Sequence, residues 1–60
     1  MCEANAYVEK EGTEVLVFKD VDFLQPSGDN ILLRDILGEE KVLNYRIKMI
    51  SFTDHKIVLE

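Results

Sequence analysis

Residues 2–10 alternate between small or apolar side chains and polar ones. The residues on the apolar side of this pattern are Cys2, Ala4, Ala6 and Val8. A period of two indicates a half-buried β-strand, because successive side chains of a strand point to opposite faces of a sheet. Residues 14–18 form a second β-branched and aromatic run, and Gly12 between the two runs supplies the positive φ of a tight turn. The two runs therefore predict a hairpin.

Short apolar runs separated by turn residues continue along the rest of the chain. We expect Lys19 and Asp20 to interrupt the second strand. Further strands are expected at residues 21–25, 31–36, 41–45, 47–52 and 56–59. Turn signals at intervals of about 8–12 residues favour a sandwich or barrel over a helical bundle. The prediction is an all-β chain folded as a small six- to seven-stranded barrel of the SH3 or Sm kind. Good helix formers within residues 39–49 leave one short helical turn there as the alternative.

The chain is long enough for one domain and too short for a generous core. A chain of 60 residues buries only about 60% of the surface that its unfolded form exposes. Chains of this size usually need a disulfide, a metal or a partner subunit, and the single cysteine excludes an internal disulfide. We expect one small β domain over residues 1–60. The residues expected in its core are Ala4, Ala6, Val8, Val15, Val17, Leu24, Ile31, Leu33, Leu43, Ile50, Ile57 and Leu59.

Charge and hydropathy limit the classes of partner. Seven basic residues stand against twelve acidic ones, which gives a net charge of −5. This balance disfavours nucleic acid, since affinity for nucleic acid rests mainly on Lys and Arg contacts to phosphates. A local basic patch stays open in the second half of the chain, where the candidates are Arg34, Lys41, Arg46 and Lys48.

The cellular compartment is predicted from what the chain lacks. No apolar run approaches the roughly 18 residues of a membrane span, so we expect no membrane partner. The first residues lack the basic and apolar segments of a signal peptide. A lone free cysteine without an export signal fits a reducing compartment. We therefore expect a cytoplasmic location.

Familiar enzyme signatures are absent from the sequence. It contains no His-Glu-x-x-His, no Gly-rich phosphate loop, no Gly-x-Ser-x-Gly and no Cys-x-x-Cys. Cys2 and His55 are a possible nucleophile and base. Such a pair would also need an orienting third group and an oxyanion site in a pocket, for which a chain of 60 residues leaves little room. We expect no catalytic activity.

Cys2 supports two interpretations. Cysteine is among the most often buried residue types, and Cys2 is in phase with Ala4 and Ala6, so it is suited to the core. Its thiolate also stands beside backbone amides near the start of the sequence, and sulfur with nitrogen donors suits planar Ni(II) or Cu(II). One residue cannot complete such a site. Two copies of Cys2 that meet across a two-fold axis would supply two sulfurs.

His55 is the only histidine, and it falls in an expected turn at residues 53–55. An exposed turn histidine without a role is the ordinary interpretation, because clusters rather than single histidines indicate a metal site. The alternative is an imidazole ligand for nickel, copper or zinc. The neighbouring Asp54 would ordinarily make a turn hydrogen bond.

Four segments carry a resemblance to a known family. The sequence starts Met-Cys-Glu-Ala-Asn-Ala-Tyr and has Val-Asp-Phe-Leu at residues 21–24. Residues 31–41 read Ile-Leu-Leu-Arg-Asp-Ile-Leu-Gly-Glu-Glu-Lys, and residues 54–59 read Asp-His-Lys-Ile-Val-Leu. With the chain length and the all-β pattern, these segments resemble the CooT-type nickel-binding proteins along the whole chain.

The resemblance implies a small homodimeric β protein that handles nickel for the maturation of carbon monoxide dehydrogenase. The second-position cysteine of the family, which corresponds to Cys2, would bind Ni(II), and the backbone nitrogen of Glu3 would help to complete the plane. Carbon monoxide dehydrogenase or its maturation proteins would be the partners. The resemblance implies no role for His55, which remains a candidate ligand on the chemistry of its imidazole alone. Relatives have also been labelled RNA-binding, so the alternative is a small-barrel RNA-binding or protein-interaction module with no metal role.

Overall fold

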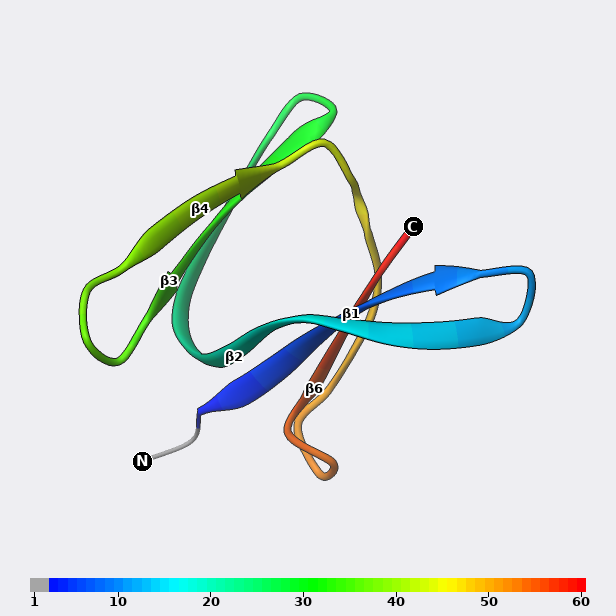
Figure 1. Ribbon diagram of the computed structural model, residues 1–60, viewed down its shortest axis with the longest axis horizontal. Coiled ribbons are helices and arrows are strands. Elements are labelled where there is room, and N and C mark those ends of the chain that lie inside the picture. The colour runs from blue at the N-terminus through cyan, green and yellow to red at the C-terminus, as the bar shows by residue number, and fades with distance from the viewer. Residues whose placement is uncertain (1–2) are drawn as a thin grey trace.

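A computed structural model describes residues 3–60 of the chain, which form six strands in one sheet and no helix (Figure 1). The strands are β1 (Ala4–Lys10), β2 (Thr13–Ser27), β3 (Asn30–Asp35), β4 (Glu40–Leu43), β5 (Ile47–Ser51) and β6 (Lys56–Leu59). Their order across the sheet is β4-β3-β2-β1-β6-β5. The predicted all-β class is confirmed.

The sheet is open, because β4 and β5 stand at its two edges and no ladder joins them within residues 3–60. The expected closure into a barrel is therefore not found. The helical alternative for residues 39–49 is wrong, since this segment contains β4 and the start of β5. Pairing is antiparallel throughout except between β1 and β6, which run parallel with Asn5 opposite Lys56 and Val8 opposite Leu59.

The first hairpin has the turn that its sequence predicts. Glu11 and Gly12 both have positive φ, at 53° and 78°, and Lys10 lies opposite Thr13. Two consecutive residues with positive φ match the right-handed twist of the flanking strands, which is why such turns dominate two-residue hairpins. The predicted pairing of the two N-terminal runs is confirmed.

The expected break at Lys19 and Asp20 is a bend within one strand. β2 runs through this point, pairing first with β1 and then with β3. Asp20 has φ 57°, and its backbone N–H donates to Asn5 Oδ1 at 3.2 Å. Aspartate tolerates this left-handed conformation better than most residues. The two runs that were predicted as separate strands are therefore one bent strand, which gives the lower of the six to seven strands predicted.

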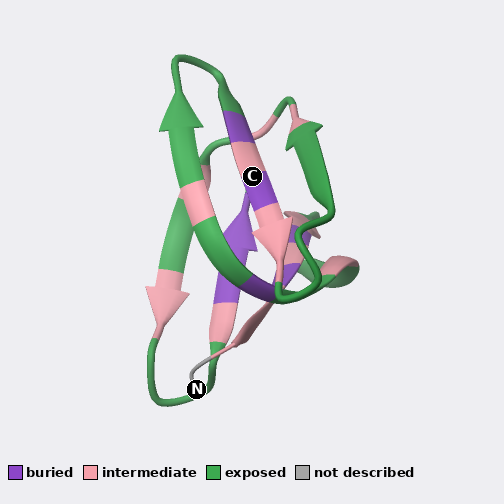
Figure 2. Cartoon of the chain, turned by 90° about the vertical axis from the view of Figure 1, so that its left-hand side faces the viewer, coloured by how far each residue is buried: buried purple, intermediate pink, exposed green. Residues whose placement is uncertain are grey.

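The buried core lies on the inner face of the bent sheet. Its members are Ala6, Val8, Val21, Ile31, Leu33, Ile57 and Leu59. Six of these seven were predicted, and Val21 was missed. Five other predicted members pack against the core while partly buried: Ala4, Val17, Leu24, Leu43 and Ile50. Figure 2 shows that the buried segments are short, while exposed segments include the turns and long stretches of the strands.

Val15 was also predicted in the core, and this prediction is wrong. Its side chain is 55% exposed, although Val8 directly opposite is buried. Val15 lies where β2 pairs with β1 alone, so within the described residues no further strand flanks it. Alternation predicts which face a residue occupies, but it does not predict how far the covering layer extends over that face.

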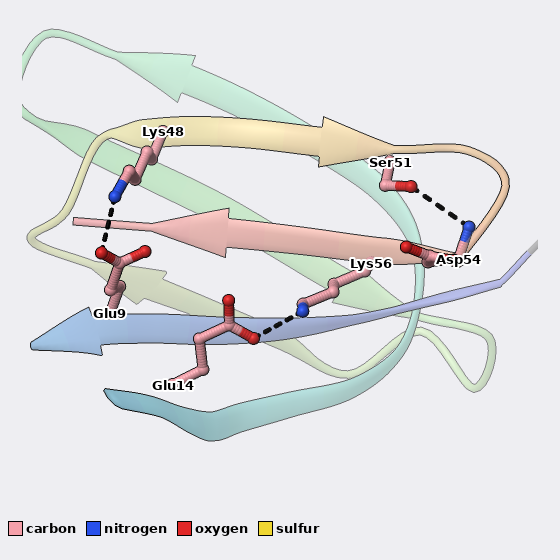
Figure 3. A network of polar contacts seen from close by, with 6 residues as sticks. All are labelled: Glu9, Glu14, Lys48, Ser51, Asp54 and Lys56. Atoms are coloured by element: carbon pink, nitrogen blue, oxygen red, sulfur yellow. Dashed lines mark hydrogen bonds and ion pairs between the residues drawn. The ribbon is translucent and has the colours of Figure 1, made fainter. Parts of the chain in front are cut away.

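Two ion pairs each span a strand of the sheet (Figure 3). Lys48 Nζ on β5 lies 2.6 Å from Glu9 Oε2 on β1, so the pair crosses β6. Lys56 Nζ on β6 lies 2.6 Å from Glu14 Oε1 on β2, so this pair crosses β1. Val58 is only 1% exposed although it is not part of the inner core, and Tyr7 of β1 and Met49 of β5 lie directly opposite it.

Candidate functional site

Cys2, the central residue of the sequence-based site, lies outside the described residues. Glu3 directly precedes β1 and is half-buried. The structure therefore describes only residues near the predicted nickel site and does not test the site itself. These residues are the start of β1 and the segments that pack around it.

His55 lies beside the start of β1, although the two are far apart in sequence. It belongs to the β5–β6 turn, where it is exposed and has φ 53°. The backbone N–H of Asn5 donates to the carbonyl oxygen of His55 at 3.1 Å. The same turn is held by Ser51 Oγ, which accepts from the backbone N–H of Asp54 at 3.2 Å (Figure 3). His55 is thus brought to within a few residues of the predicted metal-binding end.

An apolar hollow of about 260 Å³ opens at this end of the molecule. Ala4 of β1 is part of its wall, next to Leu24 of β2 and Ile50 of β5, while the buried Val21 and Ile57 also line it. The polar residues in its lining are Asp22, Ser51 and His55. Three segments that are distant in sequence therefore converge on one hollow, and the first strand contributes to it.

Two aromatic residues line the hollow and are partly or largely exposed. Phe52 is 85% exposed and Phe23 is 39% exposed, and both line the hollow. The Arg34 guanidinium lies 4.3 Å from the centroid of the Phe23 ring, within the range of a cation–π contact. Phe52 follows the apolar run of β5 directly, so its pattern is that of one more strand residue. The sequence held no signal that this ring would stand in solvent.

Two of the four basic residues considered for a nucleic-acid surface form ion pairs with acidic residues. Lys48 pairs with Glu9, and Arg34 Nε lies 3.9 Å from Glu40 Oε2. The hydrogen bond to Glu9 raises the pKa of Lys48 above its ordinary value of 10.5. These contacts place anionic carboxylates next to two of the four candidate phosphate-binding side chains, which weakens that alternative.

Within residues 3–60, no three His, Cys, Asp or Glu side chains lie close enough together to form a metal site. This part of the chain also has no helix long and apolar enough to cross a membrane.

Comparison with known proteins gives matches over essentially the whole chain. The family model described as CO dehydrogenase accessory protein CooT matches residues 1–60. The uncharacterized protein MJ1551 of Methanocaldococcus jannaschii is 33% identical over 60 residues, covering 100% of this chain and 98% of the relative. The crystal structure of CooT from Carboxydothermus hydrogenoformans superposes with a TM-score of 0.90 at 39% identity, covering 98% of this chain and 95% of that one. The resemblance predicted from the sequence is confirmed.

Proposed function

The chain belongs to the CooT family of CO dehydrogenase accessory proteins, and from this premise we propose that it carries Ni(II) as cargo for the maturation of carbon monoxide dehydrogenase. Cys2 binds the metal at an interface between two copies of the chain. In this proposal the protein is a cytoplasmic metallochaperone or nickel-handling factor without catalytic activity. Its partners are carbon monoxide dehydrogenase or the proteins that mature it.

The family match over residues 1–60 is the observation that carries the proposal, since this range includes Cys2 and Glu3. Two thiolates with backbone nitrogens, including that of Glu3, form a sulfur and nitrogen donor set that suits planar Ni(II). A shared site follows from symmetry, because a two-fold axis brings each Cys2 to its own copy without any further sequence requirement. These ligands bind only after losing their protons, so the affinity for Ni(II) rises with pH.

His55 is the remaining donor candidate of the described residues. Its turn is hydrogen-bonded to Asn5, so its imidazole belongs to the same end of the molecule as the start of β1. In the proposed site it acts as an additional ligand or as a transient one during metal transfer. Substitution of His55 then weakens nickel binding less than substitution of Cys2.

A Ni(II) titration of the chain with its native N-terminus tests the proposal, followed by absorption spectroscopy and calorimetry. We expect one nickel per two chains, with thiolate-to-metal charge-transfer bands. Cys2→Ser should abolish both signals, while His55→Ala should keep the bands and reduce the affinity. Circular dichroism of each variant controls for folding. Binding of equal strength and stoichiometry in Cys2→Ser would refute the proposed site.

A further inference from the structure

Within residues 3–60, the first half of β2 has a strand on one edge and none on the other. Residues 13–18 pair with β1, whereas β3 pairs only with residues 21–27. Figure 3 shows this half of β2, which carries Glu14, beside β1 on the side away from β6. Since only alternate residues of an antiparallel strand bond to a given neighbour, the other amides and carbonyls face the open edge. Such an edge is a template for pairing with another strand.

β3 leaves this edge at Asp35, whose side chain fixes the turn into β4. Asp35 Oδ1 accepts the backbone N–H groups of Leu37 and Glu39, both at 2.9 Å. The same turn is attached to the bend of β2, because the Ile36 N–H donates to the Asp20 carbonyl oxygen at 3.0 Å. The chain is therefore turned away at the point where β3 would otherwise continue along the first half of β2. The open edge is a fixed feature of the fold.

A hollow of about 400 Å³ lies where the open edge meets the bend, and it is called the edge hollow below. Leu16, which is 45% exposed, belongs to its apolar lining. The charged residues of the lining are Asp20, Asp35 and Glu39 together with Lys19, so three carboxylates stand against one ammonium group. The edge hollow thus combines an accessible apolar side chain with a net negative charge.

An extended basic segment of another protein matches this surface. Strand addition supplies main-chain hydrogen bonds to the edge, while neighbouring pockets select the side chains at alternate positions. An apolar side chain of the segment would contact Leu16, and a Lys or Arg would meet the carboxylates of the edge hollow. A second copy of this chain is less complementary, because it carries a net charge of −5. Nucleic acid is disfavoured, since the same carboxylates repel phosphates.

We propose that residues 13–18 of β2 accept an extended segment of a partner protein as an added strand, with a basic side chain of that segment in the edge hollow. The surface gives the chain a means of protein recognition that is separate from its proposed nickel site. Neither Cys2 nor His55 takes part in it. The test therefore uses the metal-free chain, so that its result does not depend on nickel.

The first test is a titration with a synthetic peptide of about eight residues that alternates lysine and valine, long enough to span the edge at about 3.3 Å per residue. Backbone amide shifts of the isotope-labelled chain report the site, and calorimetry reports the affinity. We expect saturable, equimolar binding with the largest shifts at residues 13–18 and 36–39. Largest shifts at β4 or β5, or no saturation, would overturn the inference. Amides of residues 13–18 that shift with protein concentration alone would assign the edge to a second copy and overturn it as well.

Charge reversal tests the edge hollow. Glu39→Lys should weaken peptide binding about tenfold, because it replaces an attractive charge with a repulsive one. Asp29→Lys is the matched control, since it makes the same change at an exposed residue of the β2–β3 turn that does not line the edge hollow. Its effect should stay below about threefold, because distant exposed charges are screened by salt. Circular dichroism controls for folding, and equal losses in both variants would overturn the inference.

Backbone methylation of the peptide tests strand addition without any change to the protein. The N–H groups of alternate residues in a strand point to the same edge, so methylation of all valine nitrogens blocks one edge of the peptide and methylation of all lysine nitrogens blocks the other. One of the two methylated peptides should lose binding to wild type, while the other keeps it. Equal binding of the two would show that the peptide is held by charge alone and would overturn the inference.

Discussion

Ile57 and Val58 are consecutive residues of β6 that face opposite sides of the sheet, and both are almost fully buried. Val58 is flanked by Tyr7 of β1 and Met49 of β5, which lie directly opposite it in the sheet. On the side of Ile57, the sheet continues into the hollow, where Phe52 remains in solvent. The chain therefore buries Val58 among its own strands, whereas the hollow on the other side leaves an aromatic side chain exposed.

The largest effect on stability is expected from a charged substitution at the buried Val58. Val58→Asp would place a carboxylate where the native side chain is 1% exposed. An unpaired buried charge costs several kcal/mol, comparable to the roughly 3–5 kcal/mol that a core of this size supplies. We expect no cooperative thermal transition for this variant by circular dichroism. Phe52→Asp, at an 85% exposed position, should fold with native-like spectra. A folded Val58→Asp would show that this side of β6 tolerates a carboxylate and is not sealed from water.

An intermediate effect is expected at Asn5, which makes hydrogen bonds to the β5–β6 turn and to the bend of β2. Its backbone N–H donates to the His55 carbonyl, and its Oδ1 accepts from the Asp20 N–H at the bend of β2. Asn5→Ala keeps the first bond and removes the second, at a cost of about 0.5–1.5 kcal/mol in the free energy of unfolding. Urea denaturation measures this cost. Asn5→Asp retains the acceptor oxygen and should lose less, so an equal loss in both variants would point away from the bend.

The smallest expected effect is the pH dependence of the outer face. Hydrogen bonds to Glu9 and Glu14 raise the pKa values of Lys48 and Lys56 above the ordinary 10.5. The folded state then holds these protons more tightly than the unfolded state, so the stabilisation is complete below pH 10.5 and is lost as the pH rises through the raised values. Denaturant midpoints should fall in this alkaline range, and less so at high salt.

The control for this titration is the double variant Glu9→Gln and Glu14→Gln. It keeps side chains of similar size at both positions and removes both charges. Its midpoint should be lower than that of wild type at neutral pH and should change less between pH 9 and pH 12, a range chosen to bracket the ordinary lysine pKa of 10.5. An identical alkaline profile in wild type and the double variant would assign the loss to other groups, such as the tyrosines.

Local rules predicted most of the strands, because turn residues and alternation act over a few neighbours. Gly12 predicted the first turn, and the alternation of Ala6 and Val8 predicted their burial. The same rules predicted a break at Asp20. The strand bends there instead, and the Asp20 N–H donates a hydrogen bond to Asn5 of β1, a residue distant in sequence. Val58 was missed because alternation assigns one face to the core, whereas this strand is buried on both.

The candidate site was less predictable, because its parts meet only through long-range pairing. The family resemblance pointed to Cys2, and ligand chemistry pointed to His55. That His55 lies beside Asn5 depends on the pairing of β1 with β6, for which the sequence contains no local signal. The hollow and the exposure of Phe52 depend on where three segments end relative to one another. Such relations belong to tertiary structure and are not encoded by any short pattern.

The parallel pairing of β1 with β6 also has a kinetic consequence. It joins residues as far apart as Asn5 and Lys56, and it links β6 and β5 to the other four strands of the sheet. Closing so long a loop carries an entropic cost that local hairpins do not carry, and topologies rich in distant pairings fold slowly. The hairpins of β1 with β2 and of β3 with β4 can form early, but without β6 nothing attaches β5 to them. The sheet is therefore complete only after the last strand has paired. Until then the edge of β1 that later pairs with β6 is open to pairing with other chains.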